Sequence, residues 1–438
     1  MEVALLCAYA GLLVHLSRQK GDRRNEPGLF FVNNRASGRT AVALSLIVSC
    51  VGASATMGMA GMAFDVGTPA FWWLGAGAAG ITLLAVLLAA KVRESGCLTM
   101  PEMVGGLLGK GSRPLVSAII VTAWTAILAA QFAALSRLLE ALTGFAALPC
   151  LAVGFALVVV HTLGGQAVIM RTDRLQAYIL FAGLAILLLW LNQRNPGWAG
   201  AVTLEAVNDK FQPADLVRLL FVVGGNYLVC PMLFGRFLSA RDATTAKRGG
   251  ILAGLGLLGC AALIVAVGLS CRGLIAPDTP ADAVLTTAID SVFPRWLAVL
   301  VLLALVSAVV SSADSCLVTS ATVLGHDLLG TDKPSHCRAA VLLLGCLGAG
   351  MTFMQRGILD FLFMAYDMYV AGVVMPVFVA LLLSRRARAR PSFAMAAIGG
   401  GGALGILSAA LAVPGLSMAG MAFSTLATLA GMRRRTGE

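Results

Sequence analysis

A hydroxyl-rich stretch inside an apolar segment holds the residue types best suited to bind a small cation. Residues 307–322 contain seven serines and threonines and a single carboxylate, Asp314. Hydroxyl and carbonyl oxygens are hard ligands of the kind that alkali and alkaline-earth ions take, and an ionisable residue within a membrane segment is a functional candidate. An isolated serine can instead bond to its own helix. The density of hydroxyls here favours a sodium site.

Two other apolar segments are interrupted by glycine and small polar residues. The first interruption covers residues 48–61, with three glycines, and the second covers residues 223–231, with a Gly-Gly pair, an amide, a phenol and a proline. Transporters built from repeats bind substrates where membrane helices break at matching positions, although small residues also allow close helix packing. We therefore expect substrate contacts from Gly52, Ser54, Thr56, Asn226 and Tyr227.

Two ionisable residues outside these stretches are further candidates. Asp367 lies about ten residues inside the apolar segment 357–383, which places it roughly 15 Å deep in a helix. Its carboxylate could hold a substrate ammonium, a second cation or a proton, or it could only bond to neighbouring Tyr and Ser residues. His161 is also within a membrane segment, where a single histidine is usually a packing residue but can relay protons.

The composition identifies the environment in which these residues work. The chain has 438 residues, of which 59% are hydrophobic and only 12% charged, and its mean hydropathy is +0.89. A soluble protein has about a quarter of its residues charged, so a soluble enzyme, a disordered chain and a nucleic-acid-binding protein are all disfavoured. Apolar runs of about 20 residues, long enough to cross a bilayer, recur along the whole chain. The fold class is therefore an all-α polytopic membrane protein.

Thirteen apolar runs are candidate membrane spans. They cover residues 2–17, 40–65, 70–90, 114–139, 147–169, 175–192, 214–238, 249–271, 296–325, 338–355, 357–383, 391–412 and 414–432. With the N-terminus outside, 25 of the 32 Lys and Arg residues fall on the cytoplasmic side, as the positive-inside rule requires. The C-terminus is then cytoplasmic, and most of the net charge of +11 faces an anionic inner leaflet.

The interrupted segments are the second and the seventh, five spans apart. This spacing predicts two five-helix repeats, at 40–192 and 213–383. Residues 1–39 then add an N-terminal helix and a basic inner loop, and residues 391–438 add two C-terminal helices and a basic tail. We expect a multi-pass protein of the cell (inner or plasma) membrane whose partners are the lipid bilayer and a small molecule, not nucleic acid. No protein partner can be named from the sequence.

Several motifs resemble those of the sodium:solute symporter family. The most specific is Ser-Ser-Ala-Asp-Ser-Cys-Leu at 311–317, followed by a helix end at Asp327. The others follow in the family's order and spacing: FFVNNRASG at 30–38, TMGMAG at 56–61 with Gly67, LTMPE at 98–102, GG, RTD and Q within 164–176, and RFLSAR at 236–241. The resemblance covers about residues 28–330, and the remainder matches only in hydropathy.

The resemblance implies a leucine-transporter-type fold, in which two inverted five-helix repeats supply ten core helices. Our count of thirteen spans places one helix before this core and two after it. The resemblance also implies a sodium ion between core helices one and eight. Its ligands would be the hydroxyls of Ser311 and Ser312 and the backbone carbonyls of Val48, Val51 and Ala308.

Three further positions take their expected roles from the resemblance. Asp173 matches a family acid near the cytoplasmic sodium exit, and Asp314 matches an acid beside the sodium site. Cys50 departs from the pattern, because some family members have Asp or Asn there. A thiol cannot replace a carboxylate charge, so this position bears on sodium affinity or stoichiometry.

We therefore expect a sodium-coupled secondary active symporter that imports a small polar organic solute, such as an amino acid or a carboxylate, by alternating access. Asp367 favours an amine-bearing solute, and the few aromatic residues in the interrupted stretches disfavour a sugar. Two alternatives stay open: proton coupling through Asp367, Asp314 or His161, and a membrane solute sensor or subunit without net transport. We do not expect an enzyme, because the sequence shows no metal-ligand cluster, P-loop or nucleophile elbow.

Overall fold

The computed structural model describes residues 2–18, 25–384, 387–411 and 413–434. Within these ranges the chain is almost entirely helical, and a helix or a run of helices covers each of the thirteen expected segments. Some of the basic residues behind the predicted orientation lie outside the described ranges, namely Lys20, Arg23, Arg24, Arg385, Arg386 and Arg435. The predicted orientation therefore depends in part on the sequence alone.

The long helices follow one another with short connections. They are α1 (Glu2–Ser17), α3 (Arg39–Cys50) with α4 (Met59–Val66), α5 (Trp72–Leu87), α8 (Ser112–Thr143), α9 (Ala147–Thr162), α10 (Gln166–Arg194), α11 (Pro213–Arg218) with α12 (Gly224–Leu228) and α13 (Pro231–Ser239), α14 (Ala243–Ser270), α16 (Arg295–Thr322), α17 (Pro334–Met351), α18 (Ile358–Tyr369) with α19 (Met375–Leu383), α20 (Pro391–Leu411) and α21 (Pro414–Gly431). Shorter elements join them, namely α2 (Pro27–Val32), α6 (Ala89–Glu94), α7 (Met100–Leu108), α15 (Val284–Val292) and the antiparallel strands β1 (Ala387–Ala389) and β2 (Met432–Arg434).

The helices have the length and composition of membrane spans. Within the described residues, nine helices are long and apolar enough to cross a bilayer. The number is ten if the bent pair Arg39–Cys50 and Ser54–Val66 forms one span. Two further apolar helices, α1 and α9, have 16 residues each. The protein is thus a multi-pass membrane protein, while the count of thirteen spans stays a prediction.

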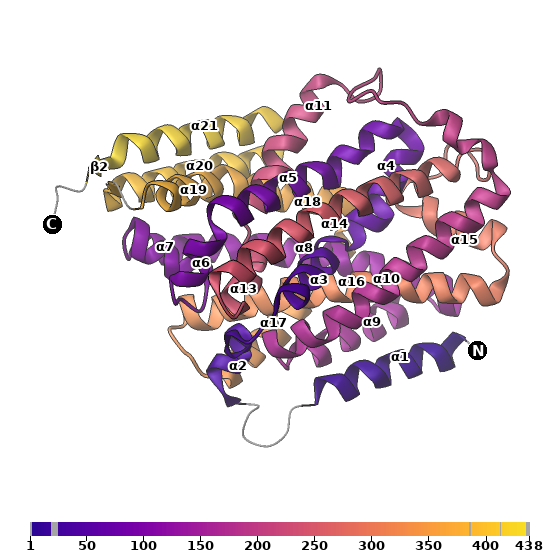
Figure 1. Cartoon of the computed structure of the whole chain (residues 1–438), viewed down its shortest axis with the longest axis horizontal. Coiled ribbons are helices and arrows are strands. Elements are labelled where there is room, and N and C mark those ends of the chain that lie inside the picture. Colours follow the sequence, from indigo (N-terminus) through magenta and orange to yellow (C-terminus); the bar gives the residue numbers. More distant parts are fainter. Residues whose placement is uncertain (1, 19–24, 385–386, 412, 435–438) are drawn as a thin grey trace.

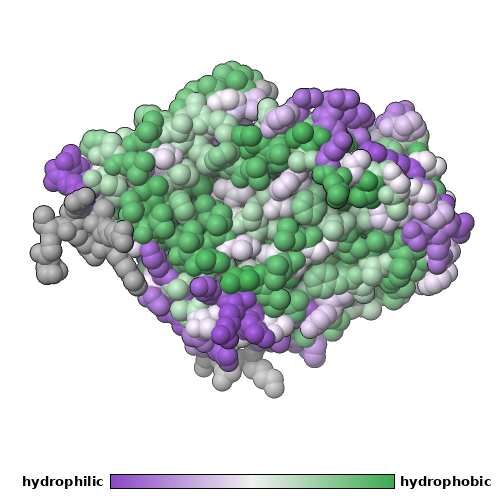
Figure 2. All heavy atoms as spheres, turned by 45° about the horizontal axis from the view of Figure 1, so that its top comes forward, coloured by the Kyte–Doolittle hydropathy of each residue, from purple (hydrophilic) through white to green (hydrophobic). Residues whose placement is uncertain are grey.

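The outside of the molecule agrees with a membrane environment. On the face drawn in Figure 2, apolar residues form a broad band and hydrophilic residues gather toward its two ends. Figure 1 shows the start of α1 at one end of the bundle and β2 at the other. Termini on opposite sides are what an odd number of crossings requires.

The two interrupted segments are broken helices. The first changes direction by 60° between α3 and the helical stretch Ser54–Val66. The second breaks between α12 and α13, where Val229 and Cys230 leave the helical region and Pro231 begins the next helix. A residue before proline prefers an extended conformation, which Cys230 has at φ −121° and ψ 119°. Each broken segment also contains a π-helical turn, a feature that often accompanies functional sites.

The hydroxyl-rich helix α16 lies at the centre of the bundle. It packs against α8, α10, α9 and α3, and almost all of its residues from Leu297 to Ala321 are buried. The C-terminal pair α20 and α21 pack on each other and on the α18–α19 region, and they lie together along one side of the molecule in Figure 1. The polar residues of α16 therefore face other helices rather than lipid.

A cluster of charged residues links α7 and α8 to the end of α16 on the side that is predicted to be cytoplasmic. Asp327, just beyond α16, accepts a hydrogen bond from Arg113 Nε at 2.7 Å. On α7, the Glu102 carboxylate lies 3.2 Å from His326 Nε2. This hydrogen bond with His326, helped by a backbone N–H, lowers the pKa of Glu102 to about 2.

Candidate functional site

The two serines of the predicted sodium site lie where α16 meets the end of α3. Ser311 Oγ donates a hydrogen bond to Asp173 Oδ1 at 2.6 Å. Ser312 Oγ lies 3.0 Å from the carbonyl oxygen of Ser49 and 3.3 Å from that of Val48. Hydroxyls of one helix and carbonyls of another therefore converge in a buried place.

The break after α3 supplies the carbonyls. Helix ends leave their last carbonyl groups without intrahelical partners, and α3 ends at Cys50 because Val51 has non-helical dihedrals of φ −96° and ψ 61°. Val48, Val51 and Ala308 are all fully buried. The five predicted ligands all offer neutral oxygen atoms, a type of ligand that suits sodium. We call Val48, Val51, Ala308, Ser311 and Ser312 the ion region.

A buried charge pair lies next to the ion region. Asp173 on α10 accepts hydrogen bonds from Ser311 and Ser45, and its carboxylate is 3.6 Å from Arg236 Nη2. Arg236, at the end of α13, donates to Ser49 at 2.9 Å and also to Ser315. In the sequence, Arg236 stands out only as the first residue of the RFLSAR motif. Because Arg236 lies inside the apolar segment 214–238, its burial could have been predicted from its position.

Asp314 has different partners from Asp173. Its carboxylate accepts a hydrogen bond from Thr162 Oγ1 at 3.0 Å and also contacts Nδ1 of His161. His161 Nε2 has no hydrogen-bond partner in the described part of the chain. His161 is therefore not an isolated packing residue, because it forms a fully buried pair with Asp314 between α9 and α16.

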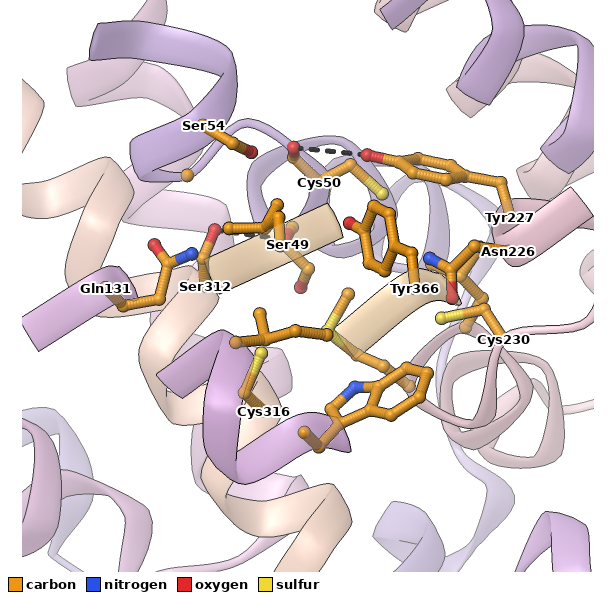
Figure 3. Close-up of a pocket in the computed structure, with 16 residues that line it drawn as sticks. Ser49, Cys50, Ser54, Gln131, Asn226, Tyr227, Cys230, Ser312, Cys316 and Tyr366 are labelled. Atoms are coloured by element: carbon orange, nitrogen blue, oxygen red, sulfur yellow. Dashed lines mark hydrogen bonds between the residues drawn. The ribbon is translucent and has the colours of Figure 1, made fainter. Parts of the chain in front are cut away.

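A small cavity of about 30 Å³ lies beside the ion region, between the two broken helices and α8, α16 and α18 (Figure 3). Its lining includes four of the predicted substrate residues, Gly52, Ser54, Asn226 and Tyr227, together with Ser312 of the ion region. The fifth, Thr56, is not in the lining, and its hydroxyl bonds back to the Gly52 carbonyl at 2.8 Å. Ser312 thus belongs to both regions.

The cavity lining contains polar groups but no charge. Among the described lining residues none is Asp, Glu, Lys, Arg or His. The lining instead offers three aromatic rings, two amides and three thiols, from Trp124, Tyr227, Tyr366, Gln131, Asn226, Cys50, Cys230 and Cys316. Tyr227 donates from its hydroxyl to the Cys50 carbonyl at 3.5 Å, the contact dashed in Figure 3.

Two buried polar atoms of the lining are free to meet a ligand. Trp124 Nε1 and Asn226 Oδ1 have no hydrogen-bond partner among the described residues. By contrast, the Gln131 side-chain oxygen already accepts a hydrogen bond from the Ala53 N–H at 3.0 Å. Because buried polar groups are normally paired, these two atoms leave one hydrogen-bond donor and one acceptor unused beside the cavity.

Gly52 brings the cavity and the ion region into contact. A Cβ atom added there would lie 2.3 Å from Ser312 Oγ and 2.7 Å from Gln131 Oε1. No side chain fits at these distances. The absence of a Cβ at residue 52 therefore allows α16 and α8 to approach the break in the first helix.

Asp367 lies outside the cavity lining, although the residue immediately before it, Tyr366, is part of the lining. Its Oδ2 is 3.2 Å from Arg218 Nη2 and accepts a hydrogen bond from Ser408 at 3.4 Å. Arg218 also stacks over the Phe363 ring at 4.1 Å. The carboxylate thus joins α11, α18 and α20. This fits the alternative in which Asp367 bonds to neighbouring side chains, although its closest partner is an arginine, and the predicted substrate contact of Asp367 is not part of the lining.

Ten lining residues were absent from the sequence-based candidates, and five of them carry an aromatic, amide or thiol group. Trp124 and Gln131 lie on α8, Tyr366 on α18, Cys316 on α16 and Cys230 at the second helix break. Gln131 is an uncommon residue in an apolar segment and was the only one of the five with a clear signal. The expectation against a sugar counted rings only in the broken stretches, and two of the three rings come from other helices.

These features together define a secondary transporter: a bundle of membrane-spanning helices, two of them broken, with an oxygen-rich ion region beside a buried cavity. The chain belongs to the sodium:solute symporter family, whose profile matches residues 30–400.

Named relatives agree with the family. A sodium/pantothenate symporter of Haemophilus influenzae is 26% identical over 354 residues, which cover 75% of this chain and 71% of the relative. The high-affinity choline transporter 1 of Caenorhabditis elegans is 25% identical over 356 residues, which cover 72% of this chain but only 60% of that transporter.

Solved structures show the same fold. A Na⁺-coupled sialic acid symporter in a substrate-bound outward-open state has a TM-score of 0.82 at 15% identity, with 98% of this chain and 96% of that chain covered. MhsT in complex with L-phenylalanine has a TM-score of 0.61 at 13% identity, with 90% and 98% covered. The fold is thus of the leucine-transporter type, as expected. The protein is a sodium-coupled symporter of a small solute and not an enzyme.

Proposed function

We propose that this protein imports a small polar solute without net charge, uncharged or zwitterionic, and that the solute binds in the cavity beside the ion region. The observation that carries this proposal is the absence of charged residues from the described cavity lining. A net charge moved from water into such a site would lose its hydration without gaining a partner. A solute with no net charge avoids this cost.

The solute is held by hydrogen bonds and aromatic faces. Trp124 offers an N–H donor, and the Asn226 amide can present either its oxygen or its NH₂ group. The rings of Tyr227 and Tyr366 lie close to Asn226 in Figure 3 and provide apolar faces. A few polar groups in an otherwise apolar and aromatic lining are typical of small-molecule sites. Asp367 is left out of this site because Arg218 and Ser408 already bind its carboxylate.

Sodium is held by the ion region and links the first broken helix to α16. The carbonyls of Val48 and Val51 belong to one side of this link, and Ala308, Ser311 and Ser312 belong to the other. Sodium therefore favours the conformations in which the two sides are together, and a ligand can shift an equilibrium only by its differential affinity for the two states.

The transport cycle follows from these contacts. Sodium and solute bind together, because Ser312 faces both sites. Movement of one group of helices against the other opens the cytoplasmic side and separates the ion ligands. Asp173 bonds to Ser311 and is therefore the first acid that the released ion can meet. Asp314 lies about one helical turn after Ser311 on α16. The two repeats at 40–192 and 213–383 supply the moving parts.

Thermal stability of the purified protein tests the sodium site without knowledge of the solute. An ion that binds only the folded state stabilises it by about 2.7 kcal/mol at one hundred times its dissociation constant. We expect a higher melting temperature in sodium than in potassium, and we expect Ser311→Ala/Ser312→Ala to remove the difference. Ser320→Ala is the matched control, since this hydroxyl of the same helix bonds to its own backbone at Cys316.

A solute screen in sodium then tests the charge of the substrate. Panels of neutral, zwitterionic, anionic and cationic compounds are compared for further stabilisation and for sodium-driven uptake into proteoliposomes. Activity confined to anions or cations would reject the proposed substrate class. Equal melting temperatures in sodium and potassium would reject the proposed sodium site.

A further inference from the structure

A second, larger cavity opens on the outside of the helix bundle. It has a volume of about 550 Å³ and lies between α8, α17, α18 and α20. Its walls are mainly apolar, and Leu347 and Ile406 on its rim are each 52% exposed. We call it the lateral groove. Because these helices cross the membrane, acyl chains are the surrounding solvent of the lateral groove.

One cation lies at the mouth of the lateral groove. Arg356 precedes α18, on the side predicted to be extracellular, and its side chain is part of the groove lining. Among the described residues, Arg356 takes part in no ion pair or hydrogen bond. Its neighbours Phe353 and Met354 are 69% and 51% exposed, so apolar side chains surround this cation on the outside of the molecule.

We propose that the lateral groove binds an anionic phospholipid of the outer leaflet, with its phosphate on Arg356 and an acyl chain along α17 and α20. Charge complementarity identifies this occupant, because an exposed guanidinium at the interface pairs well with a phosphate. The apolar walls below Arg356 match a hydrocarbon chain. A zwitterionic lipid can fill the same groove, but the net attraction between its headgroup and Arg356 is weaker.

The lateral groove and the substrate cavity share one helix. Met364 and Met368 of α18 line the groove, whereas Leu362 and Tyr366 of the same helix line the substrate cavity. A lipid in the groove therefore contacts the back of the helix that carries a substrate residue. Lipid binding is expected to shift the position of α18 and hence the rate of sodium-driven uptake.

Native mass spectrometry of the full chain in detergent tests the proposal. The probes are phosphatidylglycerol and phosphatidylcholine with identical oleoyl chains. We expect tighter retention of phosphatidylglycerol, and about a fivefold loss of its affinity in Arg356→Gln, since one basic residue near a membrane surface contributes about that factor. Ala409→Phe, which fills the groove, should weaken the binding of both lipids.

The control is Arg194→Gln, which removes the same charge on α10, a helix that packs on α16 and α3 rather than on the groove. Equal retention of the two lipids by the unmodified protein would overturn the proposal, as would an equal loss in the two arginine variants. A dimer that Ala409→Phe dissociates would also overturn it, because a second copy would then occupy the groove. Both arginines are exposed, so their replacement leaves the fold intact.

Discussion

The ion region and the substrate cavity are neighbours, yet they handle charge in opposite ways. Beside the ion region, Asp173 and Arg236 are both fully buried and their charged groups lie 3.6 Å apart. The described lining of the cavity has rings, amides and thiols but no charged residue. The comparison indicates that the protein compensates charge beside the proposed ion region and offers hydrogen bonds in the proposed solute cavity.

The strongest test of this difference removes the charge beside the ion region. We expect Asp173→Asn to destabilise the protein by about 3–5 kcal/mol, because it leaves the Arg236 guanidinium buried without its counter-charge. The measurement is the melting temperature and the free energy of unfolding in detergent. The double variant Asp173→Asn/Arg236→Met should recover much of the loss. An Asp173→Asn variant as stable as the original would show that the pair does not compensate charge.

The next test acts on the boundary between the two regions. Gly52→Ala places a methyl group 2.3 Å from Ser312 Oγ, and overpacking of this kind costs about 1–3 kcal/mol. We expect both sodium-dependent stabilisation and solute affinity to fall. Gly225→Ala is the control, since the nearest atom to its added methyl group is 3.5 Å away. If Gly52→Ala lowered only the sodium-dependent stabilisation or only the solute affinity, the ion region and the cavity would be less closely connected than we infer.

A smaller effect is expected within the cavity alone. Trp124→Phe keeps a ring but removes the unpaired N–H, which should lower solute affinity by a factor of about ten, the effect of roughly one good hydrogen bond. Sodium-dependent stabilisation should be unchanged. Trp73→Phe, a buried ring outside the cavity lining that packs on Phe363, is the matched control. If Trp124→Phe bound the solute as tightly as Trp73→Phe and the original protein, a hydrogen bond from the Trp124 N–H to the solute would be excluded.

The smallest effect concerns a charge outside both regions. Because its pKa is lowered to about 2 by the hydrogen bond with His326, Glu102 stabilises the fold fully above pH 4.5, and this contribution is lost as the pH falls from 4.5 toward 2. Melting temperatures over this range should decline less steeply in Glu102→Gln. The affinity for a neutral solute should not follow the same curve. Identical curves for the two proteins would contradict the role of Glu102.

The sequence predicted the parts of the molecule that follow from local pattern. The apolar runs follow from composition, and the helix breaks near Gly52 and Pro231 follow from small and polar residues that are unusual in a membrane helix. The approach of Ser312 to Val48 was expected from the resemblance to the symporter family, and the structure places the two residues in contact. Thr56 lies in the first broken stretch, but its hydroxyl bonds to the Gly52 carbonyl and it is not part of the cavity lining. The roles of the remaining site residues stay predictions.

Residues on regular helices were harder to predict. Trp124, Tyr366 and Cys316 line the cavity because of how α8, α18 and α16 are rotated against each other, and rotation is a property of tertiary packing rather than of one segment. Asp367 shows the same limit, because one position along α18 separates it from Tyr366 and turns it from the cavity toward Arg218. A single sequence gives the depth of such a residue but not its face.

The shared hydroxyl of Ser312 makes the link between ion and solute measurable from either side. If sodium binding tightens solute binding by some factor, the solute must tighten sodium binding by the same factor. A compound that lowers the sodium concentration needed for half-maximal stabilisation is thereby a ligand of the neighbouring cavity, even if it is bound too weakly to detect directly. Sodium can thus serve as the reporter with which the transported compound is found.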